Sequence, residues 1–256
     1  MASNYAEIYQ SWRTDPEGFW GEAAANIDWT KRWDKIFDAD AGVYGHWFAG
    51  AQCNTCHNCV DRHVSGGRGE QLALIYDSPV TGQVRRFTYA QLKEEVATLA
   101  AVLQDMGVKT GDRVIIYMPM IPEAAFAMLA CARIGVIHSV VFGGFAAKEL
   151  ATRIDDAKPS VILSASCGIE GAKIVAYKPL LDEAVNLATH KPAACLMLQR
   201  PQLPADLTDG RDRDWGREIA AAKQAGRQAD CVSVAATDPL YILYTSGTTG
   251  IPKGVV

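Results

Sequence analysis

The sequence predicts an α/β fold, in which alternating strands and helices form a largely parallel, doubly wound sheet, preceded by an aromatic-rich, mainly helical or loop segment. From Gln71 onward, short apolar runs alternate with stretches of helical periodicity and with turn residues. Strands that alternate with helices are joined by right-handed crossovers, so the strands lie parallel and helices cover both faces of the sheet. Before Gln71, large aromatic side chains are dense and strand-like runs are few.

The first unit combines a strand, a turn and an amphipathic helix. The apolar run 72–76 predicts a buried strand, and Pro and Gly over 79–82 indicate a turn. Thr88 and Gln91 have the spacing of a capping box, which opens a helix, and Gly107 is a natural end for it. One apolar stripe of this helix faces the core through Leu92, Val96, Leu99, Leu103 and Met106.

The same pattern recurs toward the C-terminus. Residues 113–118 form a strand whose centre is apolar on both faces, as a central parallel strand requires. Further strands are predicted over 136–142, 160–163, 194–198 and 240–244, helices over 122–134, 146–155, 180–188 and 215–225, and a loop over 199–213.

Composition excludes several classes of protein. The 256 residues are 49% hydrophobic and 21% charged, which rules out a disordered chain, a fibrous chain and a small disulfide scaffold. No run approaches the roughly 20 apolar residues of a membrane span, and the formal net charge of -4 argues against a general nucleic-acid surface. The N-terminus lacks an export pattern, so we expect a reduced, cytoplasmic protein with no nucleic-acid or membrane partner.

Residues 1–67 are predicted to form an extension that packs on a main body comprising 68–256. The aromatic side chains of the extension suit burial against a larger surface. A stacking surface for single-stranded nucleic acid is the alternative. The acidic residues interspersed with the aromatics would repel phosphate, so packing is favoured.

Four residues close together suggest a metal or haem site: Cys53, Cys56, His57 and Cys59. The spelling Cys-x-x-Cys-His matches c-type haem attachment, and adding Cys59 or His63 gives a possible zinc set. Haem attachment normally accompanies export, and structural zinc sites usually pair two separated couples of ligands. We therefore interpret the cysteines as small side chains that fill a packed segment, and predict no metal site.

A glycine-rich segment follows the last predicted strand. Its three glycines allow a tight curl, its hydroxyls and amides donate hydrogen bonds, and Lys253 adds a compact positive charge. The spacing is neither that of a Walker P-loop nor that of a dinucleotide fold. These features predict a polyphosphate site formed by Thr245, Ser246, Gly247, Thr248, Thr249, Gly250 and Lys253.

Residues 244–254 resemble the phosphate loop of the adenylate-forming (AMP-binding) enzymes, and the resemblance extends over essentially the whole chain. The run 58–63 (NCVDRH), the preceding aromatic segment and 140–145 (VVFGGF) are similar to short-chain acyl-CoA synthetases. The stretch 168–173 (GIEGAK) with 177–179 (YKP) looks most like propionyl-CoA synthetases; acetate-type enzymes tend to carry arginines where Glu170 and Lys173 stand.

The resemblance implies a two-step ligase reaction. ATP with Mg²⁺ activates a short-chain carboxylic acid, propionate before acetate, as an acyl-adenylate, and coenzyme A then displaces AMP. The resemblance places Glu170, Gly171, Ala172 and Lys173 near the nucleotide end of CoA, with Lys173 suited to a phosphate. Positioning and charge stabilisation suffice for this chemistry, so no residue of the chain is predicted to be a catalytic nucleophile.

The resemblance also predicts that 68–256 is the first part of a large AMP-binding domain, cut after the phosphate loop. We therefore expect an N-terminal fragment that is inactive alone. The alternatives are another adenylate-forming enzyme and a non-catalytic nucleotide- or metal-binding module. The oligomeric state is not predicted.

Overall fold

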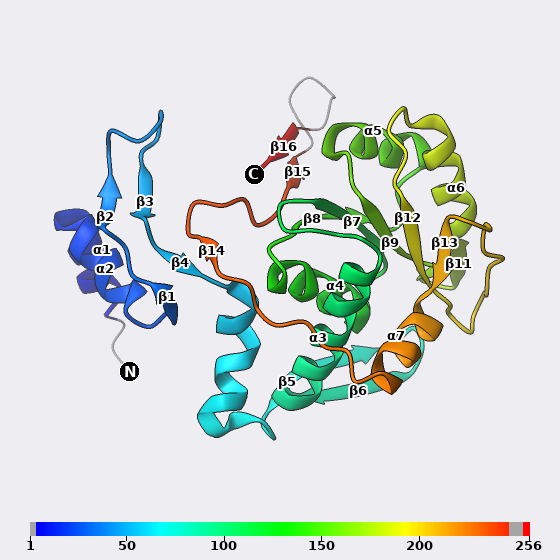
Figure 1. Cartoon of the computed structure of the whole chain (residues 1–256), viewed down its shortest axis with the longest axis horizontal. Coiled ribbons are helices and arrows are strands. Elements are labelled where there is room, and N and C mark those ends of the chain that lie inside the picture. The colour runs from blue at the N-terminus through cyan, green and yellow to red at the C-terminus, as the bar shows by residue number, and fades with distance from the viewer. Residues whose placement is uncertain (1–3, 246–252) are drawn as a thin grey trace.

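A computed structural model describes residues 4–245 and 253–256 of the chain (Figure 1). Its centre is a five-stranded sheet in the order β13-β12-β9-β7-β8, with every neighbouring pair parallel. The strands are β7 (Arg113–Met118), β8 (Ile137–Phe142), β9 (Val161–Ala165), β12 (Ala194–Leu198) and β13 (Asp212–Asp214). The predicted parallel sheet is confirmed.

Helices cover both faces of this sheet, as predicted. One face carries α3 (Tyr89–Asp105), α4 (Pro122–Arg133) and α7 (Trp215–Gln224), and the other carries α5 (Ala147–Ala157) and α6 (Tyr177–Leu187) (Figure 1). Successive strand residues point to opposite faces. Val114 and Ile116 therefore pack with the first group of helices, whereas Ile115 and Tyr117 pack with the second. The sheet is thus doubly wound.

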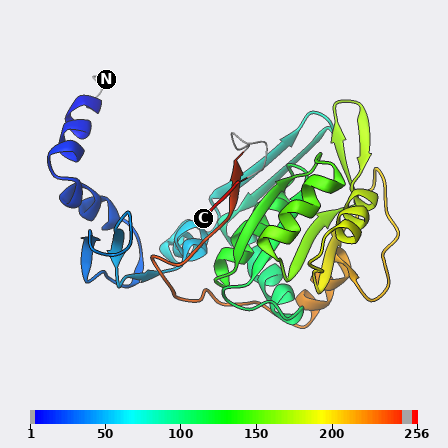
Figure 2. The same cartoon turned by 90° about the horizontal axis from the view of Figure 1, so that it is seen from above.

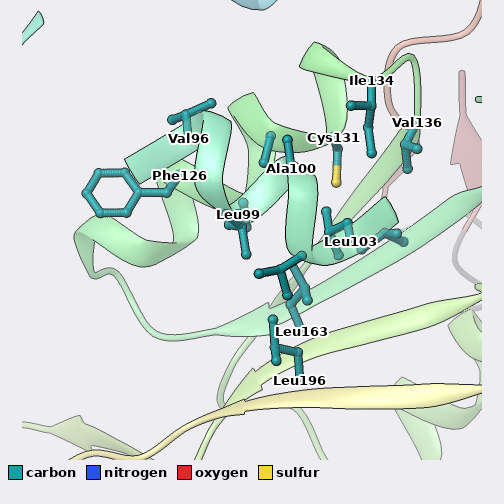
Figure 3. Close-up of a cluster of buried hydrophobic side chains, with 14 of the residues drawn as sticks. Val96, Leu99, Ala100, Leu103, Phe126, Cys131, Ile134, Val136, Leu163 and Leu196 are labelled. Atoms are coloured by element: carbon teal, nitrogen blue, oxygen red, sulfur yellow. The ribbon is translucent and has the colours of Figure 1, made fainter. Parts of the chain in front are cut away.

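The larger core lies between the sheet and α3. Leu163 and Leu196 of the sheet lie beneath Leu99 and Leu103 of α3 (Figure 3), and all four side chains are at most 1% exposed. The predicted apolar stripe of this helix therefore faces the core, and close packing of this kind leaves no room for water.

Local signals place the start of α3 correctly. The Thr88 hydroxyl accepts a hydrogen bond from the Gln91 amide N–H at 3.3 Å, and the Gln91 side chain accepts one from the Thr88 N–H at 2.9 Å. Two N–H groups that helix geometry leaves without partners are thereby satisfied. Gly107 follows the helix with φ of 88°, a conformation that L side chains rarely adopt.

The predicted buried strand at 72–76 is wrong in its burial. The structure has an antiparallel hairpin of β5 (Leu72–Ser78) and β6 (Gln83–Thr88), with Leu72 and Ile75 exposed. The turn at 79–82 is confirmed. Strand β6 was not predicted because its Val-Arg-Arg sequence lacks an apolar run, whereas a hairpin needs only one covered face.

Three further elements differ from the predictions. Strand β13 begins within the last two residues of the predicted loop 199–213, and an antiparallel hairpin of β10 (Cys167–Glu170) and β11 (Lys173–Ala176) was not predicted. The predicted strand 240–244 is not a full sheet strand. It makes one parallel bridge, between Tyr241 and His138, before β15 (Leu243–Thr245) pairs with β16 (Lys253–Val255).

The N-terminal segment contains helices, as predicted, and short strands that were not predicted. The helices are α1 (Tyr5–Thr14) and α2 (Pro16–Ala24), which extend away from the sheet (Figure 2). The strands are β1 (Trp29–Lys31), β2 (Lys35–Asp38), β3 (His46–Ala49) and β4 (Gln52–Cys53). Strand β4 pairs with β1 and with β14 (Val234–Ala235), and wide helical turns follow over His57–Asp61 and Val64–Arg68.

The predicted burial of the aromatic side chains against the main body is wrong for several of them. Trp29, Trp33 and Phe48 contact one another, with ring centroids 5.2 to 5.5 Å apart. Exposed aromatic side chains in this segment are Tyr5, Tyr9, Trp12, Trp20, Tyr44 and Trp47. No helix among the described residues is both long enough and apolar enough to cross a membrane.

Candidate functional site

The described ends of the predicted phosphate segment form the β15–β16 hairpin. Thr245 and Lys253 are register partners across the two strands, and both are exposed. Ser246, Gly247, Thr248, Thr249 and Gly250 lie outside the described residues. The structure therefore brings the two ends of the segment together, with Thr245 leading into it and Lys253 leading out.

Contacts with α5 hold this hairpin. The Tyr244 hydroxyl donates a hydrogen bond to Asp156 Oδ2 at 2.5 Å, and the Arg153 guanidinium lies 5.3 Å from the Tyr244 ring centroid. Burial and the Asp156 carboxylate raise the pKa of Tyr244, so the phenol stays protonated and remains a donor. A side chain in place of Gly254 would approach the Tyr244 ring at 3.3 Å, so glycine permits this close packing.

The segment leading to the hairpin runs alongside β8, the edge strand of the sheet. His138 donates its backbone N–H to the Leu240 carbonyl at 3.3 Å, and Ile242 donates to the His138 carbonyl at 2.9 Å. Because the two segments run parallel from this bridge, Thr245 lies toward the end of β8. Open α/β sheets bind ligands at this edge.

A cavity of about 510 Å³ lies at the same edge. The ends of β7 and β8 contribute Met118 and Phe142, the β10–β11 hairpin contributes Glu170, and Leu243 belongs to β15. The lining is mostly apolar with a few polar side chains, as in many small-molecule sites.

Two glycines shape this cavity. A side chain at Gly143 or Gly168 would clash with the ring of Tyr177, so the tyrosine occupies space that only glycine leaves free. Burial, together with the negative charge of Glu170, raises the pKa of Tyr177 to about 12. Tyr177 therefore presents a neutral phenol to the cavity at neutral pH.

The structure places the four residues predicted to meet CoA together at the tip of one hairpin, but only one of them lines the cavity. Glu170 and Lys173 are cross-strand partners in the β10–β11 hairpin, and Gly171 turns the chain with φ of 59°. All four residues from Glu170 to Lys173 are exposed. Glu170 lines the cavity, whereas Gly171, Ala172 and Lys173 are outside its lining.

Arg200 is a candidate binding residue that sequence reasoning missed. It follows β12, lines the cavity and is 9% exposed. Its guanidinium donates to the Cys167 carbonyl at 3.1 Å, and its backbone N–H donates to the Ser166 hydroxyl at 2.9 Å. Because arginine stays charged at any physiological pH, Arg200 places a fixed positive charge at the cavity. The available signal was a cation two residues after a buried parallel strand.

The four residues of the possible zinc or haem site differ in burial and partners. Cys56 is buried, as predicted for packing, whereas Cys59 is exposed, so the packing interpretation is wrong for Cys59. His57 Nε2 lies 3.3 Å from Asp28 Oδ2. Among the described residues, the group of three potential metal ligands is a different one, namely Cys56, Asp61 and Cys231.

Comparisons with known proteins agree with this architecture. Residues 61–256 match the family described as "AMP-binding enzyme", and residues 5–59 match "Acetyl-coenzyme A synthetase N-terminus". A solved structure, acetoacetyl-CoA synthetase from Streptomyces lividans, superimposes on 100% of this chain and 38% of its own, with a TM-score of 0.87 and 27% identity.

Similar sequences carry related names. Acyl-CoA synthetase short-chain family member 3, mitochondrial, from Homo sapiens is 51% identical over 255 residues, which are 99% of this chain and 37% of the relative. Propionate–CoA ligase from Salmonella typhimurium is 45% identical over 252 residues, covering 98% of this chain and 40% of the relative. The chain thus spans less than half the length of these relatives. Since the AMP-binding match covers most of its residues, the chain belongs to the AMP-binding enzyme family.

Proposed function

We propose that the protein, in a form with the full length of its relatives, activates a short-chain carboxylic acid with ATP and transfers the acyl group to coenzyme A. The observation that carries this proposal is the position of the β15–β16 hairpin. Its ends, Thr245 and Lys253, are register partners beside the carboxyl-terminal part of β8, and its residue Leu243 borders the cavity that contains Arg200.

The first step brings two anions together. The carboxylate oxygen attacks the α-phosphorus of ATP, and pyrophosphate leaves. The Lys253 ammonium and the Thr245 hydroxyl, with the segment 246–252 between them, bind the β- and γ-phosphates and stabilise the charge on the departing pyrophosphate. Mg²⁺ carried by ATP would help to neutralise the charge of these phosphates.

In the second step the CoA thiol attacks the acyl carbon and AMP leaves. Arg200 and Lys173 are the cations we assign to CoA phosphates; Glu170, as a carboxylate, does not bind a phosphate and only lines the cavity. Propionate is the preferred acid, with acetate next, because 168–173 resembles propionyl-CoA synthetases and a relative is named a propionate–CoA ligase.

The proposal extends to domains and location. Residues 1–67 form an extension, and 68–256 are the first part of the AMP-binding domain; the family matches at 5–59 and 61–256 support this division. The predicted location is the cytoplasm, although a relative's name includes "mitochondrial". Cell fractionation with an antibody to the protein distinguishes the two compartments.

The decisive experiment measures the first half-reaction alone. In the full-length protein, Lys253→Ala should slow propionate-dependent exchange of pyrophosphate into ATP about a hundredfold, the scale of losing one transition-state donor. Lys173→Ala is the matched control. It removes a lysine outside the β15–β16 hairpin that we assign to the second step, so pyrophosphate exchange should be unchanged. Equal exchange in the wild type and Lys253→Ala would contradict the role of the hairpin.

The CoA contacts are tested in the second half-reaction. Arg200→Ala should raise the KM for CoA about tenfold or more, as expected for a lost charge-assisted hydrogen bond, while pyrophosphate exchange stays at the wild-type rate. Arg200→Lys, which keeps the charge but not the planar fork, should recover part of this loss. If Arg200→Ala slows exchange as well, Arg200 supports the cavity as a whole and the CoA assignment fails.

A further inference from the structure

A buried polar cluster joins three segments of the chain at the end of α4. Arg133, at the end of α4, donates to Asp61 Oδ2 at 2.6 Å and to Asp61 Oδ1 at 3.0 Å. The same guanidinium lies 3.6 Å from Cys56 Sγ, and Cys231 Sγ donates to Asp61 Oδ2 at 3.7 Å. None of these side chains lines the cavity or belongs to the hairpin.

The two cysteines of this cluster face each other. The sulfur atoms of Cys56 and Cys231, together with a carboxylate oxygen of Asp61, all lie within 4.8 Å of one another. Both thiols are free, and a disulfide bond requires about 2.05 Å between sulfurs. Cys56 is fully buried, whereas Cys231 is only half-buried and lies in the extended connection before β14. A small side-chain movement therefore separates the observed pair from a bonded one.

The surrounding charges give the two sulfurs different character. The pKa of Cys56 is lowered, mainly by a hydrogen bond from Cys231 and also by the positive charge of Arg133. These two effects outweigh burial, which raises the pKa. The hydrogen bond with Cys56 and burial raise the pKa of Cys231. Cys56 is thus favoured as the thiolate, which is the nucleophile in disulfide formation, and Cys231 as the protonated partner nearer to solvent.

The same charges disfavour a metal ion. Arg133 occupies both oxygens of Asp61, and the Lys93 ammonium lies 3.4 Å from Asp61 Oδ1. A cation bound by Cys56, Asp61 and Cys231 would have to displace or face two positive side chains, at a cost set by the low local dielectric. Redox chemistry of the sulfur pair needs no such rearrangement.

We propose that Cys56 and Cys231 form a dithiol site that a small peroxide converts into an intramolecular disulfide. The Cys56 thiolate attacks one oxygen of hydrogen peroxide; an S–O bond forms, the O–O bond breaks, and the released hydroxide takes up a proton as water. Cys231 sulfur then attacks the sulfur of the Cys56 sulfenic acid; the S–S bond forms, the S–O bond breaks, and the departing hydroxide takes the Cys231 thiol proton as a second water. Each sulfur loses one electron and the peroxide is reduced to two waters.

The disulfide covalently ties the 52–61 region to the connection that follows α7. Three residues after Cys231, β14 begins to pair with β4, and the chain then continues to the bridge at His138 and to the β15–β16 hairpin. Oxidation therefore anchors the start of the connection that leads through β14 to the candidate phosphate site. A covalent loop also restricts the unfolded chain, so the oxidised protein should resist urea more strongly than the reduced one.

The test treats the fully reduced, purified protein with hydrogen peroxide, blocks remaining thiols and identifies cross-linked peptides by mass spectrometry without reductant. We expect loss of two free thiols per chain, a cross-link between the peptides of Cys56 and Cys231, recovery of both thiols with dithiothreitol, and a higher urea midpoint in the oxidised form. Cys59→Ser, which removes an exposed neighbouring thiol, should leave the cross-link intact.

Cys56→Ser and Cys231→Ser should each abolish the cross-link. Their circular dichroism and urea midpoints are compared with those of the reduced wild type, and for any variant that fails to fold, the wild-type peptide map alone decides. Oxidation of Cys56 to sulfinic acid without a cross-link to Cys231, or a cross-link through Cys59 instead, overturns the proposal. Stoichiometric zinc in the purified protein that is lost in Cys231→Ser also overturns it, in favour of a metal site.

Discussion

The N-terminal segment and the doubly wound sheet are both rich in apolar side chains, but they bury them very differently. Leu163 and Leu196, in the sheet, are fully buried. Trp12 of α1 and Trp47 of β3 are 39% and 37% exposed, and α1 contains no buried residue. A sheet offers two extended faces that helices can cover, whereas short helices and two-stranded pairs provide no second layer. Apolar content alone therefore does not predict burial; the number of layers does.

The two regions are joined by a buried ion pair, and breaking it should have the largest effect. Arg133 is 3% exposed and donates both hydrogen bonds to Asp61, which belongs to the wide helical turn that connects the segments. Arg133→Ala leaves the Asp61 charge buried and without its main partner, which should lower the free energy of unfolding by about 3–5 kcal/mol. Urea denaturation followed by circular dichroism measures this loss.

Arg85→Ala is the control for this variant. Arg85 also pairs with an acidic side chain, Glu123, at 2.6 Å, but its own side chain is 41% exposed. The expected loss is about 1 kcal/mol or less, because water screens the pair. Similar losses in the two variants would mean that burial of the Arg133 pair does not decide its contribution.

The second prediction compares the cores directly. Leu163→Ala opens a cavity between β9 and α3 and should lower the free energy of unfolding by about 3 kcal/mol, within the usual range for buried leucines. Trp12→Ala removes a larger side chain from α1. It should nevertheless change the free energy of unfolding by about 0.5 kcal/mol or less, because the indole is already partly exposed to water. A large loss from Trp12→Ala would show that α1 packs against something in solution.

The sheet and its central helices could be predicted because their signals are local. The bounds of β7 were predicted to the residue, and the Thr88–Gln91 capping box marks the start of α3. Strand β13 could not be predicted, because Asp-Arg-Asp has no apolar pattern and the strand joins the sheet edge through backbone bonds to β12. For the candidate site, the phosphate segment was recognisable as one continuous motif. Arg200 was not, since it meets the cavity only after the chain has folded.

The third prediction concerns the bridge between the sheet and the segment leading to the hairpin. Burial lowers the pKa of His138 from its usual value near 6.5 to about 4, and the ring lies 5.8 Å from that of Tyr241. As the pH is lowered, His138 takes up a proton near pH 6.5 in the unfolded chain but only near pH 4 in the folded protein. The free energy of unfolding therefore decreases as the pH is lowered through this range. From pH 7 to pH 5 the loss attributable to His138 is about 2 kcal/mol.

His138→Phe removes the titrating group while keeping a ring at the same position. Its unfolding free energy should therefore depend less on pH between pH 7 and pH 5 than that of the wild type, by about the same 2 kcal/mol. Asp61 has a lowered pKa because its bonds to Arg133 and Lys93 outweigh burial, so its contribution is lost only at lower pH and does not confuse the comparison. Parallel pH profiles of the two proteins would argue against a buried, neutral His138.

The smallest effect, and the sharpest comparison of the two regions, comes from helix caps. Thr88 caps α3 in the core and Asp15 caps α2 in the N-terminal segment, where its carboxylate accepts a hydrogen bond from the Gly18 N–H at 2.9 Å. Thr88→Ala should lower the global free energy of unfolding by about 1 kcal/mol. Asp15→Ala loses a similar hydrogen bond. If the N-terminal segment opens independently of the sheet, this loss lowers the free energy of local opening and hardly changes the global free energy of unfolding. Its effect should appear as faster amide hydrogen exchange confined to α2, with a global change of about 0.3 kcal/mol or less. Equal global losses would mean that both regions unfold as one cooperative unit, despite their difference in burial.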